Sequence, residues 1–109
     1  MAGLISVNKE KTWSAANWVF DHILRISRKH LPKEGSARVV ELLENIVPGL
    51  YSISLEKLST EEMKIFRETL EAAYKEVLFA GRESFREPEF YPGFMKRFEE
   101  LIEMIPSDR

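Results

Sequence analysis

The sequence predicts an all-α fold, in which four helices form a single bundle-like domain over residues 1–109. The length of 109 residues is typical of one domain with one hydrophobic core. Four segments, which together cover more than half of the chain, repeat apolar residues at intervals of three and four. This spacing gives each segment one apolar face, and the four faces can bury one another.

The first expected helix covers residues 14–30, where apolar residues recur at helical spacing. Trp13 and Trp18 lie at or near its start. The second expected helix is short and covers residues 36–49, in which Ser36 can cap the start and a Pro-Gly pair ends the helix. These two helices supply the first half of the predicted bundle.

The third expected helix is the clearest and runs from Leu58 to Gly81. Ser59 and Glu62 have the spacing of a capping box, and Leu58 and Met63 flank that box as a hydrophobic staple. Gly81 supplies the signal that ends the helix. At about 1.5 Å per residue the helix is roughly 30 Å long, which is the width of a small domain. We therefore expect it to be the spine of the fold.

The fourth expected helix covers residues 92–106 and lies between two prolines. Two shorter segments, Leu4–Val7 and Tyr51–Leu55, have the residue pattern of short strands. They are compatible with a minor two-stranded ribbon and equally with extended loop. Because an isolated pair of strands is only marginally stable, the prediction of an all-α domain does not depend on them.

Composition favours a soluble protein of the cytoplasm. The chain has no cysteine, and its N-terminal segment lacks the long apolar run of a signal peptide. No apolar stretch approaches the roughly 20 residues that span a bilayer, so we expect no membrane association. The net charge of −2 is unevenly distributed, since residues 1–40 carry seven basic and three acidic side chains. The remainder is acidic, which suits a basic partner, although solvated helix faces give the same asymmetry.

No motif for catalysis, metal binding or cofactor binding is recognisable in the sequence. His22 and His30 are the two histidines, and they are too far apart on one helix to share a metal ion. The five glycines are isolated, so no phosphate-binding loop is present. The carboxylates lie on the polar sides of the expected helices, where they are solvated. We therefore expect no enzymatic activity, no metal and no cofactor.

Nucleic-acid binding is disfavoured. The basic residues that could contact phosphates gather near the end of the first expected helix, at Arg25, Arg28 and Lys29, with Lys33 and Arg38 nearby. The isoelectric point of about 5.8 opposes the electrostatic attraction that dominates such binding. The cluster also lies at a helix C-terminus, whereas phosphates prefer helix N-termini.

The stretch FREPEFYPGF, Phe85–Phe94, combines four aromatic residues with two prolines. One interpretation is a connector in which Phe85, Phe90 and Phe94 seal the core. The other is a stiff protein-binding surface, with Tyr91 outward because of its polar tip. The two interpretations are compatible. The expected partner-binding residues are Glu83, Arg86, Glu87, Glu89 and Tyr91.

The segments LSTEEMKIFRETLEAAYKEV and FMKRFEELIEMIPSDR resemble bacterial immunity proteins, which are small helical proteins that neutralise toxins of contact-dependent inhibition or polymorphic toxin systems. The resemblance implies a cognate protein toxin as partner, with a basic surface, and often a nuclease. An acidic patch on the immunity protein would then imitate phosphate and speed association. No residue role is carried over, because immunity contacts differ between pairs.

A competing function is a structural or regulatory helical module, for example a homodimer that buries Trp13 and Trp18 between its subunits. Measurement of the mass in solution separates these classes, because a monomer with an exposed acidic loop favours the inhibitor. Nucleic-acid binding is the third class and predicts salt-dependent binding to generic DNA or RNA.

Overall fold

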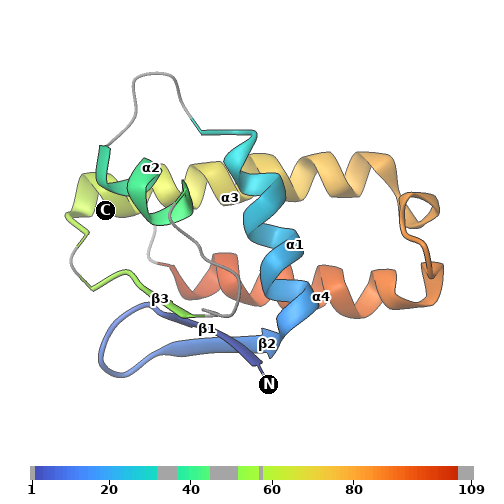
Figure 1. The fold of residues 1–109 in the computed structure, drawn as a ribbon, viewed down its shortest axis with the longest axis horizontal. Coiled ribbons are helices and arrows are strands. Elements are labelled where there is room, and N and C mark those ends of the chain that lie inside the picture. The colour runs from blue at the N-terminus through green and yellow to red at the C-terminus, as the bar shows by residue number, and fades with distance from the viewer. Residues whose placement is uncertain (1, 32–36, 45–51, 57, 106–109) are drawn as a thin grey trace.

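The computed structural model describes residues 2–31, 37–44, 52–56 and 58–105. In this part of the chain a three-stranded sheet packs against α-helices, and two short 3₁₀ turns lie between the last two helices (Figure 1). The elements in chain order are β1 (Ala2–Ser6), β2 (Thr12–Ala16), α1 (Asn17–Arg28), α2 (Ala37–Glu44), β3 (Ser52–Ser54), α3 (Thr60–Ala80), the 3₁₀ turns η1 (Arg82–Ser84) and η2 (Pro88–Phe90), and α4 (Tyr91–Met104).

The sheet shows that the expected all-α fold is wrong. The strand order is β2-β1-β3, with β1 antiparallel to β2 and parallel to β3. The pairing considered for Leu4–Val7 and Tyr51–Leu55 is present as the β1–β3 contact, although Tyr51 lies outside the described residues. β2 overlaps the expected start of the first helix at residue 14, and its pairing with β1 makes a sheet rather than a minor ribbon.

β2 forms a strand because its side chains alternate between the two faces of the sheet. Trp13 and Ala15 are buried, and the three residues around them are exposed. A short turn joins β1 to β2, in which the Oδ1 atom of Asn8 accepts hydrogen bonds from the amides of Glu10 at 2.8 Å and Lys11 at 2.9 Å. The hairpin therefore has both a buried face and a side chain that closes its turn.

The helices follow the sequence predictions more closely. In α3 the capping box is confirmed, since Ser59 Oγ accepts from the Glu62 amide at 3.1 Å and Glu62 Oε1 accepts from the Ser59 amide at 2.8 Å. Gly81, with φ of +78°, ends the helix in a backbone region that favours glycine. α4 begins at Tyr91, one residue before the expected start. No helix in the described residues is long and apolar enough to span a membrane.

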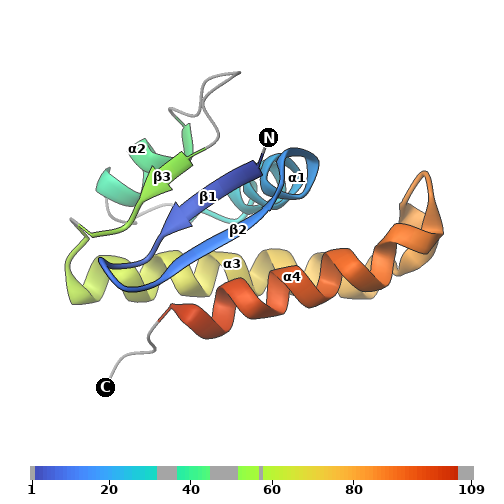
Figure 2. The same cartoon turned by 90° about the horizontal axis from the view of Figure 1, so that it is seen from below.

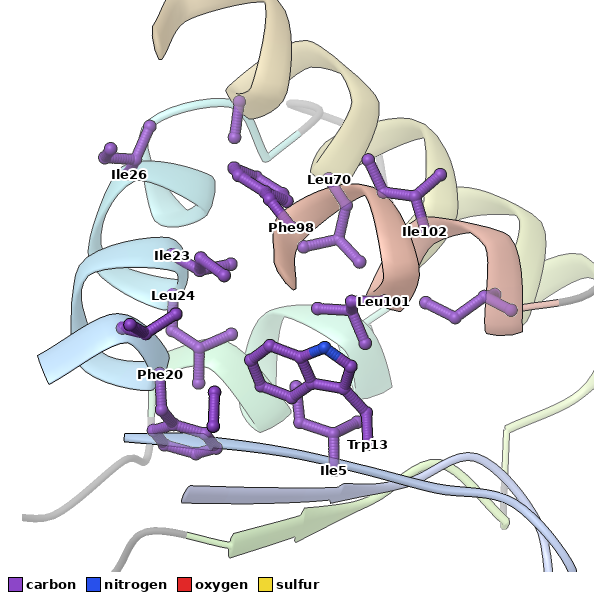
Figure 3. Close-up of a cluster of buried hydrophobic side chains, with 14 of the residues drawn as sticks. Ile5, Trp13, Phe20, Ile23, Leu24, Ile26, Leu70, Phe98, Leu101 and Ile102 are labelled. Atoms are coloured by element: carbon purple, nitrogen blue, oxygen red, sulfur yellow. The ribbon is translucent and has the colours of Figure 1, made fainter. Parts of the chain in front are cut away.

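Two of the helices, α3 and α4, run antiparallel side by side, and α1 crosses them (Figures 1 and 2). The sheet packs with one face against these helices, as Figure 3 shows for Ile5 and Trp13, which rise from the strands toward Leu101. The Nε1–H group of Trp13, which is 2% exposed, donates to the carbonyl oxygen of Arg97 at 2.9 Å. This hydrogen bond ties β2 to α4.

The sheet and α1 approach each other closely at Gly3. A Cβ atom on Gly3 would lie 2.3 Å from the Cβ and Cγ atoms of Phe20 on α1. Because real Cβ atoms do not come so near to other heavy atoms, only glycine allows β1 and α1 to pack at this separation. The second expected helix is described only from Ala37 to Glu44, so its expected cap Ser36 lies outside the described residues.

Candidate functional site

The segment between α3 and α4, together with the first residue of α4, is called the α3–α4 turn below and comprises residues 81–91. It lies at the end of the helix pair that is remote from the sheet (Figures 1 and 2). Among the expected partner-binding residues, Glu83, Arg86, Glu87 and Glu89 are exposed, and Tyr91 is half-buried. The charged residues of this set are thus at the surface, on one short segment.

Backbone hydrogen bonds hold the α3–α4 turn in a defined shape. The amide of Ser84 donates to the carbonyl oxygen of Gly81 at 3.1 Å, and the Ser84 hydroxyl donates to the same oxygen at 2.7 Å. Pro88 starts the turn η2, whose last residue Phe90 donates from its amide to the carbonyl of Glu87 at 3.0 Å. The segment is therefore a compact pair of turns rather than an open loop.

The aromatic residues of the turn do not all lie where the sequence placed them. Phe94 is buried, as expected, and Phe85 is half-buried against it with ring centroids 5.1 Å apart. Phe90 was expected in the core but is 48% exposed. Tyr91 was expected outward but packs edge-on against Phe85, with centroids 5.4 Å apart. The outward aromatic side chain is Phe90, because η2 precedes α4 and turns that residue away from the core.

Trp18 completes this surface and was not among the expected site residues. It lies in the first turn of α1, is 45% exposed, and stacks on buried Phe94 with centroids 5.9 Å apart. Its ring also contacts Phe90, with centroids 5.7 Å apart and an angle of 39° between the planes. A tryptophan is a typical interface residue, so the residue type was a signal. However, no neighbouring part of the sequence indicates that α1 lies beside the turn.

A cleft of about 240 Å³ separates α1 from the α3–α4 turn. Its lining includes Trp18, His22, Phe85, Arg86, Glu87 and Phe90. We refer to it as the aromatic cleft. Most of its walls are ring faces and edges, and the charged groups in the lining are one guanidinium and one carboxylate.

His22 forms part of the inner wall of the aromatic cleft. Its ring lies 5.0 Å from the centroid of Phe94, edge to face, and 5.6 Å from that of Phe85. Burial lowers the pKa of His22 below its usual 6.5, and the positive charge of Arg25 lowers it further. The imidazole is consequently neutral at pH 7.

Two basic residues near the end of α1, Arg25 and Lys29, pair with acidic side chains. Arg25 contacts Asp21 at 2.5 Å, and Lys29 Nζ lies 3.5 Å from Glu76 Oε2. His30 Nε2 lies 2.6 Å from the other oxygen of Glu76, and this hydrogen bond lowers the pKa of the Glu76 carboxyl below its usual 4.5. These pairs reduce the positive charge that a phosphate backbone would meet.

A second hollow, of about 420 Å³, lies between β2 and α4. Its charged lining includes Arg97 and Glu100, which form an ion pair with Nη1 and Oε1 2.9 Å apart. Within the described part of the chain, no three histidine, aspartate or glutamate side chains are grouped as metal ligands. Trp13, which borders this hollow, is buried inside its own chain, so a dimer cannot bury it between subunits without unpacking the core.

Comparison with known proteins finds no family model, no curated protein and no solved structure that matches this chain.

Proposed function

We propose that this protein is an immunity protein, which binds a cognate bacterial toxin in the cytoplasm and neutralises it without catalytic activity of its own. The observation that supports a binding role is a pair of half-exposed rings in contact: Trp18, which stacks on buried Phe94, and Phe90, which packs against Trp18. The choice of a toxin as the partner is based on the resemblance of the third and fourth helical segments to immunity proteins.

Large rings fixed at a protein surface are typical centres of binding energy, because they bury much area and lose little conformational entropy. Trp18 and Phe90 contact each other and are backed by packed side chains, so they are already ordered before a partner arrives. The surface therefore has the properties of an interface rather than of an ordinary solvated helix end.

The glutamates of the turn surround these rings with negative charge. Glu83, Glu87 and Glu89 are exposed, and they outnumber the two arginines of the segment, Arg82 and Arg86. Exposed charges of this kind contribute little affinity, but they raise the association rate with an oppositely charged protein. A nuclease toxin with a basic substrate groove fits this charge pattern, and its blocked groove would explain neutralisation.

The test takes as candidate toxin the C-terminal domain of a large secreted protein encoded next to this gene, and a neighbourhood without such a gene would count against the function. Binding to the purified domain is measured by biolayer interferometry, and protection is measured as growth of cells that express it. Trp18→Ala and Phe90→Ala should each weaken binding about 10- to 30-fold, mainly through faster dissociation. Glu83→Gln and Glu89→Gln should mainly slow association, and only at low salt.

Leu4→Thr is the matched control, since Leu4 is 41% exposed but lies on β1, remote from the turn. It should leave binding and growth protection unchanged. Equal binding by the Trp18, Phe90 and control variants would refute the proposed surface, and absence of growth protection by the unaltered protein would refute the function.

A homodimer is the competing function, because Trp18 and Phe90 could also pack against a second copy. Light scattering over a range of concentrations decides between them. A dimer that Trp18→Ala dissociates would assign the surface to self-association, whereas a monomer at all concentrations leaves it available to a different protein.

A further inference from the structure

We infer that the aromatic cleft binds a lysine or arginine side chain of the protein partner, an inference that rests on the proposed function. The cleft is open at the surface, and its lining includes the rings of Trp18 and Phe90, which contact each other with centroids 5.7 Å apart. A group that enters the cleft therefore meets both rings from the same side.

Ring faces carry partial negative charge and attract a cation within about 6 Å of the ring centroid. Tryptophan is the strongest of the aromatic side chains in this respect. At an exposed site each such contact changes the affinity about two- to fivefold. The guanidinium of arginine is also flat, so it can stack on an indole ring in a way that an apolar side chain of the same length cannot match.

The charges of the cleft favour the same occupant. Glu87 contributes an exposed carboxylate to the lining, and Glu83 and Glu89 lie on the same short segment. His22 at the inner wall adds no positive charge at pH 7, because its ring is held neutral between Phe85 and Phe94.

One charged side chain in the lining repels a cation, and replacing it gives a decisive test of the inference. Arg86 borders the cleft, so it repels an entering guanidinium or ammonium group. Arg86→Gln should therefore tighten the binding of a cation, whereas it would weaken the binding of an acidic group and leave that of an apolar group unchanged. The sign of this one effect identifies the chemistry of the occupant.

The experiment titrates the protein with Nα-acetyl-arginine methylamide and follows the two indole Nε1–H signals by ¹⁵N-edited NMR. Trp18 reports the cleft, and Trp13 is an internal control because its Nε1–H group is buried and bonded to the Arg97 carbonyl. Nα-acetyl-citrulline methylamide is the matched neutral probe, since it has the same shape without the charge.

We expect a saturable shift of the Trp18 signal alone, with the citrulline probe about two- to fivefold weaker than the arginine probe. Arg86→Gln should tighten the arginine probe about twofold, and Glu87→Gln should weaken it about twofold. Glu89→Gln is the control for the general effect of removing a negative charge, because Glu89 lies on the turn but does not line the cleft. Its effect on the arginine probe should be smaller than that of Glu87→Gln.

Equal binding of the two probes, an unmoved Trp18 signal, or weaker arginine binding by the Arg86→Gln variant would each overturn the inference. The proposed function is tested separately by the toxin domain. If that domain binds while the arginine probe does not, the cation site is wrong and the binding surface stands. If neither binds, both are wrong.

Discussion

The same substitution should destabilise the protein strongly at Trp13 and hardly at all at Trp18. Trp13→Phe removes the hydrogen bond to the Arg97 carbonyl, worth about 1 kcal/mol, at a site that is 2% exposed. The smaller ring also leaves a space between β2 and α4 that costs about 1 kcal/mol more. Trp18→Phe keeps an aromatic ring on Phe94 at a half-exposed site, so its cost should stay within about 0.5 kcal/mol.

Urea unfolding followed by circular dichroism measures both variants. Trp13→Phe should lower the free energy of unfolding by about 2 kcal/mol and the Tm by roughly 8 °C, with an unchanged m-value. The Trp18→Phe variant should unfold at nearly the same urea concentration as the unaltered protein. If the two variants lose equal stability, or if Trp18→Phe loses more, then Trp13 does not join the sheet to α4 as described.

Four further outcomes follow from the surroundings of single residues. Gly3→Ala forces a Cβ atom into the phenylalanine ring of α1 and should cost about 1–3 kcal/mol of unfolding free energy. Gly93→Ala, in a helical position with no atom within 4 Å of the new Cβ, should instead gain about 0.5–1 kcal/mol in the same urea assay. The lowered pKa of His22 favours its neutral form in the folded state, so the unfolded chain binds the proton first. The stability contribution of His22 is complete above about pH 6.5 and decreases as the pH falls, and denaturation at several pH values should give a smaller slope for His22→Gln. The hydrogen bond to Glu99 and partial burial raise the pKa of Tyr74 to about 12, and absorbance at 295 nm should therefore show a late-titrating phenol that Glu99→Gln moves to lower pH.

The parts of the fold that sequence predicts well are those specified by neighbouring residues. α3 was found within two residues at its start, because Ser59 and Glu62 form the capping box and Gly81 stops the helix. β2 was missed because its partner β1 is a separate segment, and because its five residues run directly into α1. Whether a segment forms a strand depends on the segment it pairs with, and five residues alone do not specify that partner.

In the candidate site too, the features set by neighbouring residues were predicted, and those set by the packing of distant elements were not. Exposure of the turn glutamates follows from their local charge and was anticipated. Trp18 was missed because it comes from α1, and only the crossing of α1 over α4 brings it to the turn. The sequence assigned Phe90 and Tyr91 the wrong way round: Phe90, the last residue of η2, is 48% exposed, whereas Tyr91, the first residue of α4, is half-buried against Phe85.

Phe94 links the proposed binding surface to the core. It is 1% exposed, it packs on Phe98 of the core, and it supports both Trp18 and His22 on its other sides. The exposed rings are therefore fixed by the same packing that stabilises the two long helices. Because ordering of side chains on binding costs about 0.5–1.5 kcal/mol each, a surface ordered during folding keeps more of its contact energy as affinity. If the protein binds a toxin as proposed, these rings should supply most of the affinity, and the charges around them should mainly raise the association rate.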